Sequence, residues 1–205
     1  MNETALARAR ALISRGGRRI LGLVGPPGAG KSTVAQQLVD ALAGAAVLLP
    51  MDGFHLANVE LARLGRAGRK GAPDTFDAGG YIALLQRVRA QQAGRDGTVY
   101  APEFRREIEE PIASSIPIPA DVPLVVTEGN YLLLERDGWA GVKPLLDEAW
   151  YVDVDDALRR QRLVERHMRF GRSEADARAW EAGTDQPNAE LIGATAARAD
   201  WRCAI

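Results

Sequence analysis

The sequence has little of what marks a secreted, zinc-binding or membrane protein. Its 205 residues include one cysteine, Cys203, which cannot form an internal disulfide and therefore fits a reducing compartment. The two histidines, His55 and His167, show no Cys/His spacing typical of a zinc site. No apolar run approaches the ~20 residues of a membrane-spanning helix. A cytoplasmic protein is the simplest interpretation of these absences.

An excess of charge of either sign is also absent. The formal net charge is −1, so there is no overall basic surface for nucleic acid. Apolar residues make up 46% of the chain, which excludes disorder as the default. The first 19 residues (MNETALARARALISRGGRR) are arginine-rich without an apolar stretch of signal-peptide length, and they predict a short amphipathic helix. We expect no nucleic-acid or membrane partner, and a homodimer stays open.

Short apolar runs alternate with helical stretches along the chain. The runs at residues 20–24, 46–49, 124–127 and 149–152 predict strands. Their alternation with helices is typical of an α/β fold, with a parallel sheet flanked by helices, in a single domain over residues 1–205. Residues 99–119 carry four prolines and predict an irregular hairpin or flap, and residues 155–199 predict two or three helices.

What the sequence does contain is a complete phosphate-binding loop (P-loop), GPPGAGKS, at residues 25–32. Its glycines let the backbone turn tightly and bring N–H groups close to phosphate oxygens. Lys31 would reach the β- and γ-phosphates, and the Ser32 hydroxyl would hold Mg²⁺. An apolar run precedes the loop and a helical stretch follows it, so the helix N-terminus would face the same phosphates. We expect the ATP phosphates to contact Gly25, Gly28, Ala29, Gly30, Lys31, Ser32 and Thr33.

Two carboxylates follow predicted strands, at the sheet edge where open α/β sheets bind ligands. Asp52, in LLPMDGFHL, would accept a proton from a substrate hydroxyl or position Mg²⁺, or else it is a turn residue before a glycine. Glu128, after PLVVT, would bind Mg²⁺ directly or through water. Asp153, after AWYV, competes for that role. We favour Glu128, because EGNY opens a loop long enough to line a site.

The segment at residues 65–77 (GRAGRKGAPDTFD) is too rich in glycine and charge for regular structure. A long loop inside a compact domain is usually functional. Mixed charges suit a polar ligand with hydroxyls and an anionic group, although a solvated surface loop is the alternative. Of the two histidines, His55 lies next to Asp52 in the sequence and could contact a substrate, whereas His167 is more simply structural. The charged residues of the loop are Arg66, Arg69, Lys70, Asp74 and Asp77.

An arginine recurs every three or four residues in the predicted helix near residues 155–170. This spacing places the arginines on one helix face. They would clamp phosphates as part of a closing lid, or they form an exposed stripe paired with acidic neighbours. The residues are Arg159, Arg162, Arg166 and Arg169.

These segments together resemble the P-loop kinases that include uridine kinase, phosphoribulokinase and bacterial pantothenate kinase. The chain is most similar to a bacterial subgroup described as nucleoside/nucleotide kinase-like or as fructose-transport-system kinases. The resemblance rests on segments from residue 25 to residue 192: GPPGAGKS, MDGFH, RKGAPDTFD, VYAPEF, VVTEGNYLLL, RHMRFGR and QPNAELI.

The resemblance implies a P-loop NTPase fold with a helical lid, and a kinase that uses ATP and Mg²⁺ to phosphorylate a hydroxyl of a small metabolite. Candidate acceptors are a sugar such as fructose, a nucleoside or a pantothenate-like molecule. Asp52 would be the base or hydroxyl ligand, and Glu128 would assist metal and substrate. The phosphates would be held by the lid arginines Arg162, Arg166 and Arg169.

The resemblance also places a set of side chains near the acceptor: Arg69, Lys70, Asp74 and Phe76. To these we add Asp52, His55, Tyr100 and Tyr131 as expected acceptor contacts. One position departs from the family pattern, because Arg105 stands where an acidic residue is expected after the aromatic of residues 100–104.

We therefore predict catalysis by Lys31, Asp52, Glu128 and Arg166, with Ser32 and Glu128 as metal ligands. The alternative is a nucleotide-hydrolysing switch or regulatory ATPase that acts on a protein partner. DAGG at residues 77–80 is a weak match to a switch D-x-x-G, but no N-K-x-D segment is present to bind guanine. A degenerate nucleotide-binding module is a third possibility, against which the intact motif residues argue.

Overall fold

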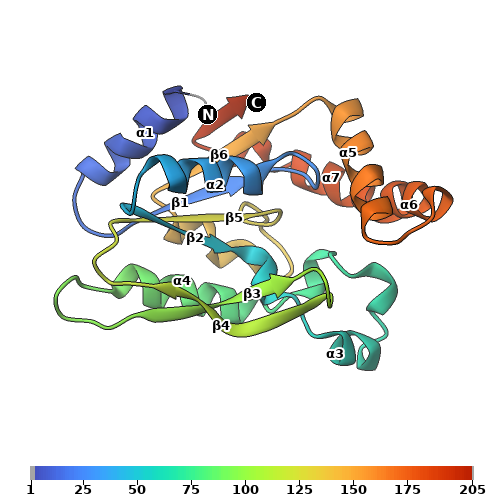
Figure 1. Cartoon of the computed structure of the whole chain (residues 1–205), viewed down its shortest axis with the longest axis horizontal. Coiled ribbons are helices and arrows are strands. Elements are labelled where there is room, and N and C mark those ends of the chain that lie inside the picture. Colours follow the sequence, from blue (N-terminus) through green and yellow to red (C-terminus); the bar gives the residue numbers. More distant parts are fainter. Residues whose placement is uncertain (1–2, 205) are drawn as a thin grey trace.

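The computed structural model describes residues 3–204, and a five-stranded parallel sheet forms its centre (Figure 1). The strand order is β2, β5, β1, β6, β7, and every neighbouring pair is parallel. The first four of these strands in chain order are the four predicted from apolar runs. β7 lies outside every predicted run. Only one of its four residues, Cys203, is fully buried, so the strand has no continuous apolar run. The strands are β1 (Arg19–Val24), β2 (Ala46–Pro50), β5 (Leu124–Gly129), β6 (Glu148–Asp153) and β7 (Trp201–Ala204).

Helices cover both faces of the sheet, so the α/β prediction is confirmed (Figure 1). Alternate side chains of β1 enter two separate apolar cores. Leu21 and Leu23 pack with α1 (Glu3–Ser14) and α2 (Lys31–Ala41), whereas Ile20 and Val24 pack with α4 (Ala78–Ala90). The helix predicted near the start of the chain is α1.

A hairpin and a helical group lie beside the sheet (Figure 1). The predicted hairpin is the antiparallel pair β3 (Val99–Arg105) and β4 (Glu110–Ile118). The helices predicted after residue 155 form the lid: α5 (Asp156–Arg169), α6 (Glu174–Trp180) and α7 (Gln186–Gly193). The remaining helix is α3 (Asn58–Arg63), and short 3-10 turns occur at η1 (Met51–Phe54), η2 (Ala67–Arg69) and η3 (Pro73–Thr75). No helix in residues 3–204 is both long enough and apolar enough to span a bilayer.

Two glycines allow the lid and the hairpin to approach the loops at the carboxyl ends of the strands. Gly28 has a φ of 81°, and a Cβ there would lie 2.8 Å from the carbonyl oxygen of Arg159 in α5. A Cβ on Gly53 would lie 2.2 Å from the carbonyl oxygen of Pro102 in β3. The lid therefore packs directly on the P-loop, and the hairpin packs directly on the segment that carries Asp52.

Candidate active site

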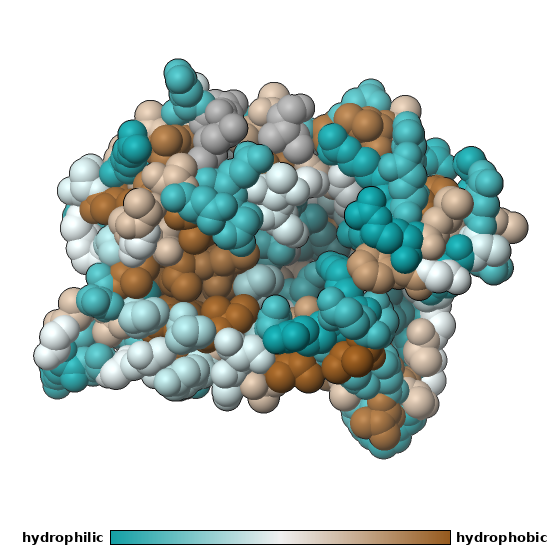
Figure 2. Space-filling model, in the orientation of Figure 1, coloured by the Kyte–Doolittle hydropathy of each residue, from teal (hydrophilic) through white to brown (hydrophobic). Residues whose placement is uncertain are grey.

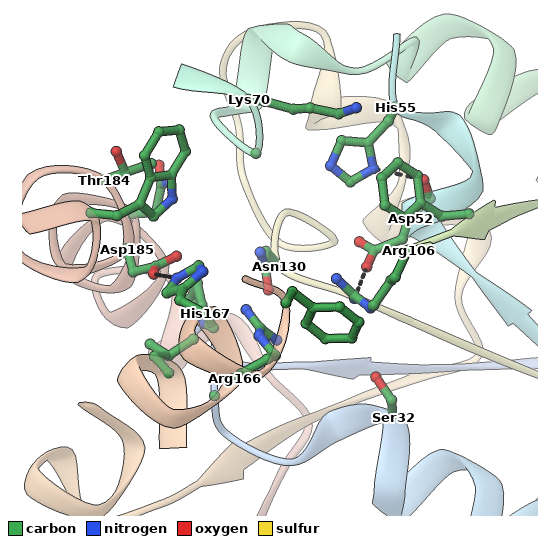
Figure 3. A pocket seen from close by; sticks show the side chains of 18 of the residues that line it. Ser32, Asp52, His55, Lys70, Arg106, Asn130, Arg166, His167, Thr184 and Asp185 are labelled. Carbon is green, nitrogen blue, oxygen red and sulfur yellow. Dashed lines mark hydrogen bonds and ion pairs between the residues drawn. The ribbon is translucent and has the colours of Figure 1, made fainter. Parts of the chain in front are cut away.

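A cavity of about 650 Å³ lies at the carboxyl ends of β1, β2 and β5. Five parts of the chain line it: the P-loop, residues 52–76 after β2, the hairpin, Glu128 and Asn130 at the end of β5, and the lid. Figure 2 shows the surface hollowed between the α5–α6 region and the region below it that carries α3, with hydrophilic residues around the opening. Figure 3 shows side chains from all five parts pointing into this space. The position is the one expected for a ligand site in an open α/β sheet.

The P-loop forms one end of the cavity. Its lining includes Gly28, Gly30, Lys31 and Ser32, together with Thr33. The other two expected phosphate contacts, Gly25 and Ala29, are buried behind this surface and do not line the cavity. The tight loop ends at Gly30, whose φ of 83° directly precedes α2.

Lys31 is held within its own loop. Its Nζ donates a hydrogen bond to the carbonyl oxygen of Pro26 at 3.0 Å, and its side chain is buried. Burial lowers the pKa of Lys31 to about 8, while the carboxylates of Glu128 and Asp52 oppose this shift. A bound polyphosphate would further favour the charged amine.

Glu128 ends β5 and contacts the P-loop. The Ser32 Oγ donates a hydrogen bond to Glu128 Oε1 at 3.0 Å. Burial raises the pKa of Glu128, and the nearby charge of Asp52 raises it further. The competing carboxylate, Asp153, lies outside this cavity, 3.7 Å from Arg202. Of the two carboxylates, Glu128 is the one placed beside the phosphate end.

The Ser32–Glu128 pair fits a magnesium ion in its chemistry. Both side chains offer oxygen, which is the donor that Mg²⁺ prefers. No group of three or more metal-binding His, Cys, Asp or Glu side chains occurs in the described part of the chain. A magnesium ion here would therefore depend on phosphate oxygens and water as well, which is its usual mode of binding beside a nucleotide.

Asp52 lies in η1 and forms an ion pair across the cavity wall. Its Oδ2 accepts a hydrogen bond from Arg106 Nη2 at 2.9 Å. Burial acts to raise the pKa of Asp52, but nearby His55, Arg106 and Lys31 outweigh it and lower the pKa overall. Because burial also lowers the pKa of His55, the charges of Arg106 and Lys31 are the contributions that persist at neutral pH. Asp52 is therefore ionised at neutral pH.

Aromatic rings and a lysine form the wall next to Asp52. The His55 ring lies between Phe76 and Phe104, with ring centroids 4.0 and 4.5 Å away. Lys70 Nζ lies 5.1 Å from the Phe104 centroid and donates a hydrogen bond to Asn58 Oδ1 at 2.6 Å. Three of the expected acceptor contacts besides Asp52, namely His55, Lys70 and Phe76, thus line the cavity.

The other four expected acceptor contacts lie outside the cavity lining of this structure. Arg69 and Asp74 pair with each other through two hydrogen bonds of 2.5 Å in an exposed loop. Tyr131 is fully buried, and its hydroxyl donates a hydrogen bond to the Gly71 carbonyl oxygen. Tyr100 is 55% exposed, because it alternates with the buried Val99 and Ala101 along β3.

The lid arginines do not act as one row. Arg162 and Arg166 line the cavity, but Arg159 is buried at the start of α5, where it binds Asp156. Arg169 is exposed and outside the lining. The ten steps from residue 159 to residue 169 span about 15 Å along a helix axis, so residues that share a face reach different places. Of the three arginines expected to hold phosphates, Arg162 and Arg166 therefore line the cavity and Arg169 does not.

Arg166 has no fixed partner in residues 3–204: no hydrogen bond or ion pair of its guanidinium occurs within the described chain. Burial lowers its pKa, and the charge of Arg106 lowers it further. The neighbouring His167 also lines the cavity, with Nε2 2.6 Å from Asp185 Oδ2. The expectation that His167 is only structural missed this position, which no spacing in the sequence indicates.

The largest omission of the sequence-based prediction is Arg106. The departure from the family pattern singled out the neighbouring Arg105, but that side chain is 54% exposed and pairs with Glu103 at 2.9 Å. Adjacent residues at the end of a strand point to opposite sides, so Arg106 turns into the cavity. The tandem arginines were the available signal, and only the packing of the hairpin decides between them.

The chain is similar to known proteins over most of its length. The chain matches the phosphoribulokinase/uridine kinase family over residues 20–179. A Schizosaccharomyces pombe protein provisionally named as a uridine kinase is 34% identical over 173 residues, which cover 80% of this chain and 72% of that protein. A pantothenate kinase of Sinorhizobium medicae is 31% identical over 162 residues, which cover 74% of this chain and 48% of that kinase.

A solved structure has the same fold along almost its whole length. It is a Silicibacter protein provisionally named as a fructose transport system kinase, with a TM-score of 0.86 and 33% identity. The match covers 97% of this chain and 98% of that one. It therefore includes the P-loop, the hairpin and the lid.

Proposed function

Because the chain belongs to the phosphoribulokinase/uridine kinase family, an ATP-dependent group of small-molecule kinases, we propose that it transfers the γ-phosphoryl group of Mg-ATP to a hydroxyl of a small metabolite. The observation that carries the proposal is the shared cavity. Lys31 and Ser32 lie at its phosphate end, Asp52 lies within it, and Arg162 and Arg166 reach it from the lid.

In this reaction the acceptor hydroxyl binds to the Asp52 carboxylate. A bond forms between the hydroxyl oxygen and the γ-phosphorus, and the bond from that phosphorus to the β,γ-bridging oxygen breaks. The hydroxyl proton passes to Asp52. A carboxylate with a lowered pKa is a weak base, and a loose transition state needs proton removal only late. Asp52 therefore acts mainly by orienting the hydroxyl.

Positive charge at the phosphate end supplies the rest of the catalysis. Lys31 compensates charge on the β- and γ-phosphates, and Arg162 and Arg166 do so from the lid. Ser32 and Glu128 would hold Mg²⁺, which neutralises charge on the phosphate oxygens when it is bound.

The acceptor is a sugar such as fructose, a nucleoside or a pantothenate-like molecule, the classes for which the relatives are named. The deciding experiment measures ATP consumption and product formation with a panel of such hydroxylated metabolites. Acceptor-dependent ADP release well above the background without acceptor supports the proposal. Slow hydrolysis that ignores every acceptor would instead indicate a nucleotide switch.

The acceptor loop gives a matched pair of variants. Lys70 lines the cavity, whereas Arg69 pairs with Asp74 outside it. Lys70→Ala should raise the acceptor KM severalfold and leave the ATP KM unchanged, because only acceptor contacts are lost. Arg69→Ala should leave both constants near their wild-type values. Steady-state kinetics with each substrate varied in turn tests this, and an equal rise of both KM values in Lys70→Ala would mean that this loop covers the nucleotide.

Variants of the lid arginines provide a second test. Arg166→Ala should lower kcat by about tenfold to a hundredfold with little change in ATP affinity, because the guanidinium acts on charge in the transition state. Arg166→Lys should recover only part of kcat, since an ammonium lacks the planar fork that spans two oxygens. Arg169→Ala, one turn further along α5 and outside the cavity, is the control. Unchanged kcat in both Arg166→Ala and Arg162→Ala, with a slightly lower melting temperature, would indicate an exposed stripe instead of a lid.

A further inference from the structure

The Arg106 side chain occupies the point where the two substrates would meet. It comes from the turn that follows β3, and it reaches Asp52 because the hairpin packs on Gly53. Figure 3 shows its guanidinium beside Asp52, in the same cavity as Arg166 from α5. Three separate elements, the P-loop, the hairpin and the lid, thus each contribute at least one cation to the cavity, among them Lys31, Arg106 and Arg166.

Of these three cations only Arg106 forms an ion pair, and its partner Asp52 also lies near the other two. Lys31 binds only a carbonyl of its own loop, and Arg166 has no ion pair within residues 3–204. After burial, the charge of Arg106 acts to lower the pKa of Arg166, and more weakly that of Lys31, where Glu128 and Asp52 oppose it. Converging like charges repel one another, and an anion placed among them would lower that cost. The arrangement fits a highly charged group placed among the three side chains.

The ion pair of Arg106 leaves both partners able to bind substrate. Arg106 uses one N–H group on Asp52 Oδ2, and a guanidinium has five. The other carboxylate oxygen, Asp52 Oδ1, accepts no hydrogen bond from the described part of the chain. An acceptor hydroxyl on Oδ1 would therefore receive the phosphoryl group within reach of the Arg106 guanidinium.

Given the proposed function, on which this inference rests, we propose that Arg106 is a further catalytic residue that contacts the transferred phosphoryl group. Before the nucleotide binds, Arg106 is held on Asp52. When the γ-phosphoryl group arrives, the remaining N–H donors of Arg106 bind its equatorial oxygens and stabilise their charge in the transition state. The bonds made and broken are those of the phosphoryl transfer described above, and Arg106 keeps its proton throughout.

Arg106→Gln and Arg106→Lys test this role, with Arg105→Gln as the matched control on an exposed neighbour outside the cavity. Two measurements are made on the full chain. Calorimetric titration gives the affinities for Mg-ADP and for the Mg complex of the non-hydrolysable β,γ-imido analogue of ATP. Kinetics give kcat and both KM values with an acceptor from the metabolite panel. Thermal melting confirms that each variant is folded.

Arg106→Gln should lower kcat about a hundredfold, as the loss of one preorganised donor typically does. It should weaken the ATP analogue severalfold while Mg-ADP binds as to the wild type, because only the γ-phosphoryl contact is lost. Arg106→Lys should recover part of kcat, and Arg105→Gln should match the wild type.

Three results would overturn the assignment: equal weakening of Mg-ADP and the ATP analogue, a raised acceptor KM with normal kcat, or no change at all. A wild-type protein that transfers phosphate to no acceptor would contradict the proposed function instead. In that case the comparison of the ATP analogue with Mg-ADP still decides whether Arg106 contacts the γ-phosphoryl group.

Discussion

Replacing Lys31 with alanine is expected to reduce turnover at least about a hundredfold, because it removes a charge placed on the transferred phosphate. The fold should survive, since the lysine amine bonds only to a carbonyl of its own loop. Removing a buried amine with a lowered pKa also removes a group whose charged form is disfavoured in the free protein. Melting temperature should therefore change little while kcat collapses.

The control for this variant is Lys143→Ala. Lys143 binds Asp200 outside the cavity lining, so its loss should affect stability alone. The measurement is steady-state turnover together with a thermal melt on both variants. Near-wild-type turnover in Lys31→Ala would contradict the P-loop assignment, whatever the acceptor is.

The position of the P-loop in the fold could be predicted from the sequence. The P-loop, its strand and its helix are consecutive in the chain, so their order and their place at the sheet edge follow from local pattern. Asp52 and Glu128 follow the same logic, since each comes at the end of a buried strand and parallel strands end at one edge.

Residues that reach the site from other elements could not be predicted in this way. Whether Arg105 or Arg106 enters the cavity depends on how the hairpin packs on Gly53. Whether an arginine of α5 reaches the phosphate end depends on where α5 crosses the P-loop at Gly28. Tyr131 follows the E-G motif at the end of β5 and was expected to contact the acceptor. In the structure its buried hydroxyl donates a hydrogen bond to the Gly71 carbonyl oxygen. Local spacing predicts the face of an element on which a side chain lies, but its contacts depend on tertiary packing.

Substitution of Asp52, which the hairpin residue Arg106 contacts, tests the proposed mechanism directly. Asp52→Asn keeps the shape of the side chain but removes both the negative charge and the proton acceptor. Phosphoryl transfer should fall by about a hundredfold to ten-thousandfold, the usual range for a lost acid–base group. ATP affinity should change little, because no phosphate contact is assigned to this carboxylate. The variant also removes the ionic partner of Arg106, so the loss should lie toward the upper end of that range.

Asp74→Asn is the matched control, since Asp74 is a carboxylate that binds Arg69 and Arg66 outside the cavity. It should leave kcat and both KM values unchanged. The decisive measurement is single-turnover phosphoryl transfer at saturating Mg-ATP, with nucleotide affinity determined separately. If Asp52→Asn lost nucleotide binding but transferred normally per bound ATP, Asp52 would be a metal or structural residue. We expect instead a loss of transfer at unchanged nucleotide affinity, because the two carboxylates have different roles in the proposed mechanism. Asp52 orients the acceptor hydroxyl, whereas Glu128 lies with Ser32 at the phosphate end of the cavity.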